Sequence, residues 1–114
     1  MVPTPEALRE LLRDPPPSPL TVLKRFGSRA SPGFLSFPRP GFTLSLDLPN
    51  QGEETFAHFA RLERVAVEAG GALYPAKDAR MSRESFERSF PRLPELVAHL
   101  DPAFSSSFWR RVSR

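Results

Sequence analysis

Proline constrains this chain more than any other residue type. Fourteen of the 114 residues are proline, and each one removes a backbone donor, ends helices and interrupts inner strands. The segment PPPSP at residues 15–19 is the densest example. We interpret it as a stiff extended spacer rather than as a docking site for a proline-recognising domain. The chain is therefore predicted to contain short helices and strands joined by stiff connections.

Two stretches have the pattern of amphipathic helices. The first is predicted to begin at Pro5, which suits a first helical turn, with Thr4 as its N-cap. It must end by Asp14, before the proline run. The second and longer helix is predicted to begin at Glu53 and to run to about residue 69, where Gly70 is well suited to follow its end.

Two stretches have the alternation of strands, residues 20–26 and residues 42–48. In the first, Lys24 shares a face with three apolar residues, so its ammonium must be paired, face a cavity or extend to water at a sheet edge. In the second, Thr43 and Ser45 lie on a polar face opposite four apolar residues. That polar face is either a wall that faces a ligand or a solvated surface.

The remaining elements are predicted to be short. They are a short strand or extended piece at residues 34–37, a strand at 72–74 that returns to the sheet, a helix at 83–90 capped by Ser82, a helix from Pro94, and a last helix from Pro102 capped by Asp101. Paired strands with helices across one face predict an α+β fold, a small antiparallel sheet with helices packed on one side. At this length we expect one domain, residues 1–114.

Composition excludes several kinds of site. The chain has no cysteine, so a disulfide, a thiolate metal site and a cysteine nucleophile are impossible. Its two histidines, His58 and His99, are isolated and predict no metal site. The sequence contains no glycine-rich phosphate loop and no nucleophile elbow.

Charge and hydropathy limit the partners. The net charge is +3, and the arginines are spread among Asp and Glu rather than gathered in a stripe, so we expect no nucleic-acid partner. The basic segment at residues 109–114 is interpreted as a solvated tail. No apolar run approaches the ~20 residues of a membrane helix, and the first residues lack the apolar core of a secretory signal. We therefore expect a soluble, cytoplasmic protein without a membrane span.

The most unusual polar stretch is residues 70–80, GGALYPAKDAR. Within seven residues it places a phenol, Tyr74, an ammonium, Lys77, a carboxylate, Asp78, and a guanidinium, Arg80. Only two of the 16 basic residues are lysine, Lys24 and Lys77. The stretch is either a solvated turn after a helix or a site that needs a compact ammonium in place of a planar guanidinium.

Six motifs, taken in order, suggest a family. They are VLKRFG at 22–27, LSFP at 35–38, the segment 41–49, GALYPAKDAR at 71–80, FPR at 90–92 and DP at 101–102. This ordered set resembles the C-terminal region of FAD-linked oxidases of the vanillyl-alcohol-oxidase superfamily, closest to the decaprenylphosphoryl-ribose 2-oxidase-like family.

The resemblance implies a substrate-domain piece. Family members are much longer and begin with an FAD-binding domain, to which nothing in residues 1–114 corresponds. The implied function is that of a fragment or subunit of a flavin-dependent oxidoreductase acting on a sugar-like alcohol, with the FAD-binding domain supplied by another chain and no activity alone. The alternative is a non-catalytic, self-associating remnant without flavin chemistry.

The resemblance also implies roles for single residues. By position, Lys24, Val22, Thr43 and Ser45 match residues that face the substrate pocket. Tyr74 and Lys77 match the catalytic pair beside the flavin ring. An ammonium there stabilises the negative charge of the reduced ring, and a phenol can position a substrate hydroxyl.

Two further expectations follow from the same reasoning. Asp78 and Arg80 are interpreted as braces that fix the loop through hydrogen bonds. A sheet cut from a larger domain has an open edge and an uncovered face. We therefore expect the chain to form a homodimer, with edge pairing as one way to do so, and a separate FAD-binding-domain protein is the other partner implied.

Overall fold

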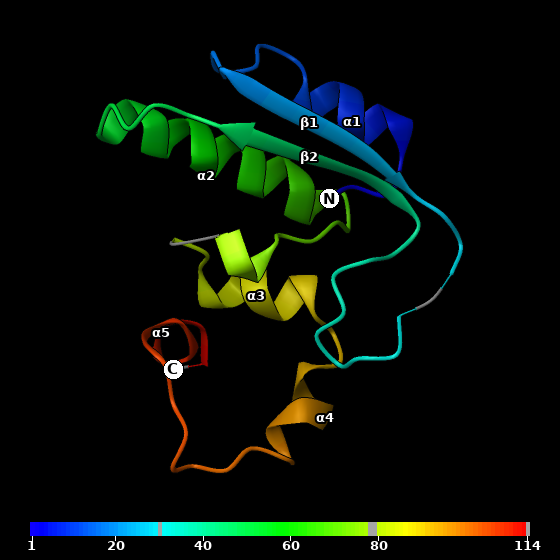
Figure 1. Cartoon of the computed structure of the whole chain (residues 1–114), viewed down its shortest axis with the longest axis vertical. Helices are drawn as coiled ribbons and strands as arrows, with labels where there is room; N and C mark the ends of the chain where they lie inside the picture. Colours follow the sequence, from blue (N-terminus) through cyan, green and yellow to red (C-terminus); the bar gives the residue numbers. More distant parts are fainter. Residues whose placement is uncertain (30, 78–79, 114) are drawn as a thin grey trace.

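The computed structural model describes residues 1–29, 31–77 and 80–113. Within these ranges the chain forms five α-helices and a two-stranded antiparallel sheet (Figure 1), which confirms the predicted α+β class. In chain order the elements are α1 Pro5–Leu11, β1 Leu20–Phe26, β2 Gly41–Asp47, α2 Glu53–Glu68, the 3-10 turn η1 Pro75–Lys77, α3 Arg83–Ser89, α4 Leu93–Val97 and α5 Ser107–Ser113.

The ends of α1 and α2 are fixed by the residues predicted to fix them. The Thr4 hydroxyl accepts a hydrogen bond from the Ala7 amide at 3.2 Å, with Pro5 in the first turn of α1. After α2, the Gly70 amide donates to the Val67 carbonyl at 3.0 Å, and the Gly71 amide donates to the Ala66 carbonyl at 2.8 Å. Gly70 has a φ of 70°, so this ending is a Schellman motif that depends on glycine.

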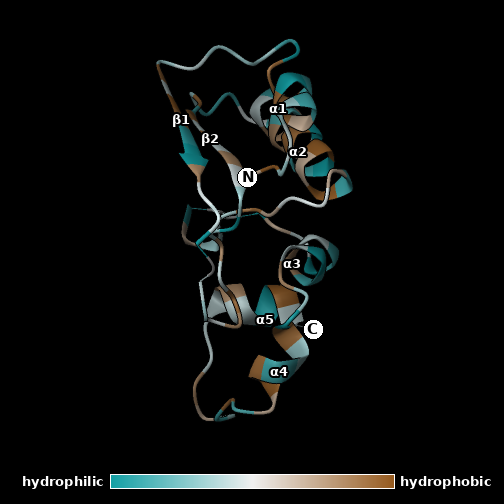
Figure 2. Ribbon diagram, turned by 90° about the vertical axis from the view of Figure 1, so that its right-hand side faces the viewer, coloured by the Kyte–Doolittle hydropathy of each residue, from teal (hydrophilic) through white to brown (hydrophobic). Residues whose placement is uncertain are grey.

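The sheet has one covered face and one open face. Phe42 and Leu44 on β2 pack with the buried cluster of Val2, Leu11 and Ala66. These residues come from the N-terminal segment, α1 and α2, and a side view shows both helices on the same side of the strands (Figure 2). The apolar face of the second predicted strand therefore packs on the helices, as its alternation indicated.

The first two residues extend this layer beyond β2. Val2 and Phe42 each donate a backbone hydrogen bond to the other at 2.8 Å. On the far side, the Met1 amine donates to the Ala72 carbonyl at 2.6 Å, and the Ala72 amide donates to the Met1 carbonyl at 3.0 Å. The N-terminal segment thus lies between the sheet and the chain that follows α2.

The prediction of a strand at residues 72–74 is wrong, because the structure has no strand there. The N-terminal segment occupies the place beside β2, and one reciprocal pair of bonds between Met1 and Ala72 does not make a ladder. The chain then leaves at Tyr74 into η1, because Pro75 has no amide to donate.

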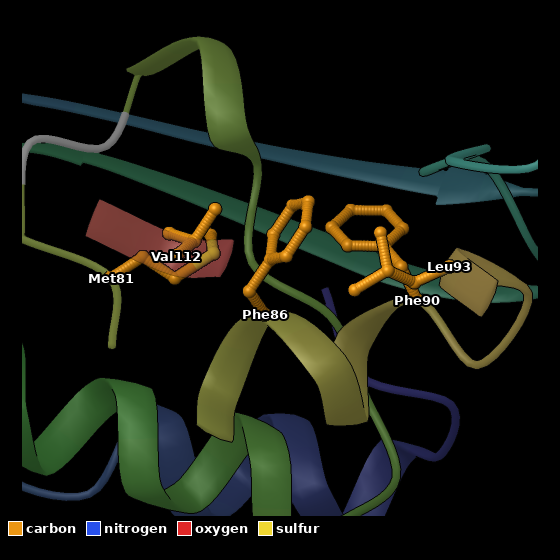
Figure 3. Close-up of a cluster of buried hydrophobic side chains, with 5 residues drawn as sticks. All are labelled: Met81, Phe86, Phe90, Leu93 and Val112. Carbon is orange, nitrogen blue, oxygen red and sulfur yellow. The ribbon is translucent and has the colours of Figure 1, made fainter. Parts of the chain in front are cut away.

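A second buried cluster lies in the half of the molecule that contains α3, α4 and α5. It consists of side chains that are at most 8% exposed, gathered beside α3 (Figure 3): Met81, Phe86, Phe90, Leu93 and Val112. Phe86 is central, with ring centroids of Phe90, Phe108 and Trp109 at 5.1, 5.5 and 6.4 Å. Leu73 packs against both this cluster and the one under the sheet.

Two other predicted elements differ from the structure. Residues 34–37 form no strand, because the chain turns there and the Ser36 amide donates to the Gly33 carbonyl at 3.2 Å. The last helix begins at Ser107 rather than at Pro102. The Asp101 carboxylate accepts from the Ala103 amide at 2.8 Å and closes a local turn.

The serine run after that turn supplies the true cap of α5. The Ser106 hydroxyl accepts from the Trp109 amide at 3.0 Å, the geometry of an N-cap. Phe104, predicted to belong to the helix, is instead 81% exposed.

Candidate functional site

The open face of the sheet carries four of the predicted site residues. The register pairs Lys24 with Thr43 and Val22 with Ser45. Residues directly opposite each other in an antiparallel pair project to the same face, and positions two apart on a strand also share a face. The structure therefore brings these four residues together in a patch that we call the sheet patch.

The sheet patch lies away from the helices. Because Phe42 and Leu44 face α1 and α2, the pleat directs Thr43 and Ser45 to the opposite side. Lys24 is exposed, and within the described ranges its ammonium has no hydrogen bond or ion pair. Of the alternatives for this lysine, the structure therefore shows a solvated ammonium and not a buried one.

A row of aromatic rings connects the sheet patch to Tyr74. Phe26 shares the face of Lys24, and its ring lies edge-on to that of Phe37 with centroids 6.3 Å apart. The Phe37 ring in turn lies 5.0 Å from the ring of Tyr74, which is 49% exposed. Sequence reasoning used Phe37 only as part of the LSFP motif and did not assign it to the site, because its residue type gives no sign of this contact.

Lys77 ends the 3-10 turn that follows Tyr74. Its amide donates to the Tyr74 carbonyl at 3.2 Å, which fixes the backbone spacing of the two residues. Lys77 is exposed, and its ammonium has no partner among the described residues. Asp78 lies outside the described residues. The Arg80 guanidinium stacks 3.9 Å from the centroid of the Phe56 ring.

Two hollows of the surface lie elsewhere. One is lined by the loop between the strands and by residues 90–92, and the other lies between α1 and α2. Lys24, Tyr74 and Lys77 line neither of them. The predicted site thus lies outside both hollows, with Lys24, Tyr74 and Lys77 exposed to water.

The strongest electrostatic perturbation lies at the N-terminal segment. Burial, and secondarily the charge of Arg39, lower the pKa of the Met1 amine from 8.0 to about 6. Burial also lowers the pKa of Arg39, whose guanidinium donates to the Ser89 carbonyl. Sequence reasoning passed over Arg39, because an arginine between two prolines has no pattern that distinguishes it.

The described ranges contain neither a metal-ligand group nor a helix that could cross a membrane. No three acidic or histidine side chains gather there as a metal site would require. The longest helix in those ranges has 16 residues, and none combines the length and apolarity needed to cross a bilayer.

The chain is similar to parts of much longer proteins. No family model matches it. The chain is 40% identical over 96 residues to an uncharacterized protein in the mprA 5' region of Streptomyces coelicolor, covering 80% of this chain and 26% of that protein. It is 37% identical over 99 residues to decaprenylphosphoryl-beta-D-ribose oxidase of Mycolicibacterium smegmatis, covering 82% of this chain and 21% of that enzyme.

The chain resembles one segment of an oxidase. It spans about a quarter or a fifth of the length of these two curated relatives. The similarity extends over most of this chain and so includes most of the described fold.

Proposed function

We propose that this chain is a substrate-domain piece of a flavin-dependent oxidoreductase that acts on a sugar-like alcohol. The FAD-binding domain that such an enzyme needs lies outside residues 1–114. The similarity to the mycobacterial oxidase supports the reaction class. The single observation that carries the proposal is the strand register, which sets Lys24 beside Thr43 and Val22 beside Ser45 on the face that the helices leave open.

The chemistry of the sheet patch suits a hydroxyl-rich substrate. Thr43 and Ser45 carry hydroxyls that both donate and accept, and Lys24 donates three hydrogen bonds. Val22 supplies an apolar contact between them. Tyr74, held through Phe37 and Phe26 at the side of this patch, has a phenol that can orient a substrate hydroxyl.

The donor set also fits a flavin. FAD, when bound, supplies the two-electron acceptor of the reaction. Lys77 has an exposed ammonium without a carboxylate partner in the described ranges. Such a cation is available to stabilise negative charge on a reduced ring. Tyr74 lies three residues before it, and the Lys77 amide bonds to the Tyr74 carbonyl, so one turn presents both groups.

The exposure of Lys24 and Tyr74 supports a role for a second domain. An oxidoreductase must cover its reacting groups to exclude water, whereas the sheet patch is uncovered. A partner that carries FAD and lies over this face would close the site.

The test is co-production of this chain with an FAD-binding domain encoded beside it, followed by measurement of flavin absorbance in the purified material. We expect a yellow complex, and we expect Lys77→Met to lose flavin while circular dichroism stays unchanged. Arg64→Met, which changes an exposed cation on α2, is the matched control and should retain flavin. A complex that stays colourless, or that keeps its flavin in Lys77→Met, contradicts the proposal.

A specific observation favours the alternative, a self-associating remnant. Among the residues that the structure describes, one edge of β1 is unpaired, and Leu20 and Leu23 on that strand are 56% and 54% exposed. Exposed apolar edges promote pairing between copies. Light scattering should then show a homodimer that Leu23→Lys converts to a monomer, and a wild-type monomer would contradict this alternative.

A further inference from the structure

The hollow beside the interstrand loop has features of a binding site. Its volume is about 260 Å³, and the residues that matter for its chemistry are Ser28, Phe34, Ser36, Arg39, Phe90 and Arg92. Most of the lining is apolar, with one guanidinium on each of the two chain segments. Small-molecule sites combine an apolar wall with few polar groups in this way. The volume is slightly below the roughly 300 Å³ at which such sites usually begin, so an occupant must be small.

Arg39 carries a positive charge that the described residues do not neutralise. Its guanidinium is half-buried, and burial lowers its pKa. No carboxylate in the described ranges lies within ion-pair distance of it, and the nearby charge is the like-charged Met1 amine. Desolvated charges in proteins are normally paired.

Arg39 also has hydrogen-bonding capacity to spare. A guanidinium has five N–H donors. One nitrogen of Arg39 donates to the Ser89 carbonyl, which ties the loop to α3. That is the one hydrogen bond that Arg39 makes among the described residues. The other N–H groups of its guanidinium are therefore available to a ligand.

Arg92 differs from Arg39 because it is already neutralised. Its guanidinium makes two hydrogen bonds of 2.8 Å to the Glu95 carboxylate, which raise its pKa. It also lies 4.8 Å from the Phe34 ring centroid. Arg92 and Phe34 thus form a fixed wall, and Arg39 remains as the charge that attracts a ligand.

We propose that this hollow binds a small amphipathic anion, an oxyanion head joined to a compact apolar body. The head takes two hydrogen bonds from Arg39, as planar guanidinium groups favour with carboxylates and phosphates. The Ser28 hydroxyl, which has no hydrogen bond among the described residues, adds a donor. The body lies against Phe34 and Phe90. This site goes beyond the proposed flavin chemistry, since the sheet patch, Tyr74 and Lys77 do not line the hollow.

Titration of the whole chain, followed by amide chemical shifts, tests the site. The probes are benzoate, phenyl phosphate, inorganic phosphate and uncharged benzyl alcohol. We expect benzoate and phenyl phosphate to saturate shifts at Gly33, Arg39 and Arg92, and to bind more tightly than the other two probes. If benzyl alcohol binds equally well, the hollow is an apolar crevice that does not select anions, and the proposal is contradicted. Weak shifts spread over all basic residues would also contradict a defined site.

Three variants distinguish an effect of the Arg39 charge on binding from an effect on folding. Arg39→Gln should weaken benzoate binding about tenfold or more, because a charge-assisted pair is lost. Arg88→Gln removes an exposed arginine of α3 outside the hollow and should leave binding unchanged. Ser28→Ala, on the exposed loop, keeps the test valid if Arg39→Gln fails to fold. Benzoate affinity that Ser28→Ala leaves unchanged, together with insensitivity to salt, would contradict the proposal.

Discussion

The backbone carbonyl oxygen of Met1 lies 2.1 Å from the point that a Cβ at Gly71 would occupy. Glycine is therefore the residue type at position 71 that leaves room for the N-terminal segment. Gly41 has the same relation to Val2, whose carbonyl oxygen is 2.4 Å from the corresponding point. The segment that extends the sheet is therefore held between two glycines. Its position depends on the missing side chains as much as on its hydrogen bonds.

Gly71→Ala is predicted to destabilise the fold by about 1–3 kcal/mol, the usual cost of forcing atoms into a packed interior. Backbone atoms of Met1 and Ala66 both stand in the way, and neither can move without losing hydrogen bonds. Urea denaturation gives the free energy of unfolding. Gly27→Ala is the control, since no heavy atom lies within 4 Å of its added Cβ. Equal stabilities for the two variants would refute the packing argument.

Stability should rise between about pH 6 and pH 8 in a protein whose Met1 amine is free. The pKa of this amine is lowered from 8.0 to about 6 on folding, so the unfolded chain binds more protons in that window. Below pH 6 the folded state carries the full cost of a buried ammonium, about 3 kcal/mol for a pKa change of two units. Above pH 8 the cost disappears because both states are neutral.

The measurement is the urea midpoint as a function of pH, with N-terminal acetylation as the control. Acetylation removes the ionisable amine and keeps one N–H for the Ala72 carbonyl. The two proteins differ only at this amine, so the difference between the two curves isolates Met1. Parallel curves from pH 5 to pH 9 would show that the amine is not buried in solution.

Phe86→Ala should cost about 3–5 kcal/mol, the range for deleting a buried phenylalanine. Its ring is fully buried and contacts the ring of Phe90, which follows α3, and the ring of Phe108 on α5. Calorimetric melting temperatures would measure the loss. Phe104→Ala removes the same atoms from a side chain that is 81% exposed and should change stability little. A comparable loss in both variants would contradict the assignment of the core.

Ser106→Ala should destabilise α5 by about 1 kcal/mol, because the Trp109 amide loses the hydroxyl that accepts its hydrogen bond. Amide hydrogen exchange at Trp109 and Arg110 should speed up. The neighbouring Ser107→Ala replaces an exposed serine inside the helix and serves as the comparison. Faster exchange in Ser107→Ala alone would place the helix start one residue later.

Local signals in the sequence predicted the fold where structure depends on neighbours along the chain. The Thr4 cap, the Gly70 helix ending and the bounds of β1 follow from side chains within a few residues. Prediction failed at residues 72–74, because the place beside β2 is taken by Val2, a partner that no local pattern reveals. It failed again at the start of α5, where two capping side chains compete.

For the candidate site too, local signals predicted some features, and contacts between distant residues determined the others. Alternation predicted a polar face that includes Thr43 and Ser45. It could not predict that Lys24 lies opposite Thr43, because a long interstrand loop leaves the register unspecified. The contact between Phe37 and Tyr74 and the half-buried position of Arg39 arise from packing across that loop. The roles of the site residues stay predictions.

Leu73 is a shared member of the cluster under the sheet and of the cluster around Phe86, and α2 also touches α3. Neither half of the molecule can therefore open without exposing a side chain on which the other half rests. Melting should be a single cooperative event, and a partner that rigidifies the strands would also slow the breathing motions of α3 and α5, far from where it binds.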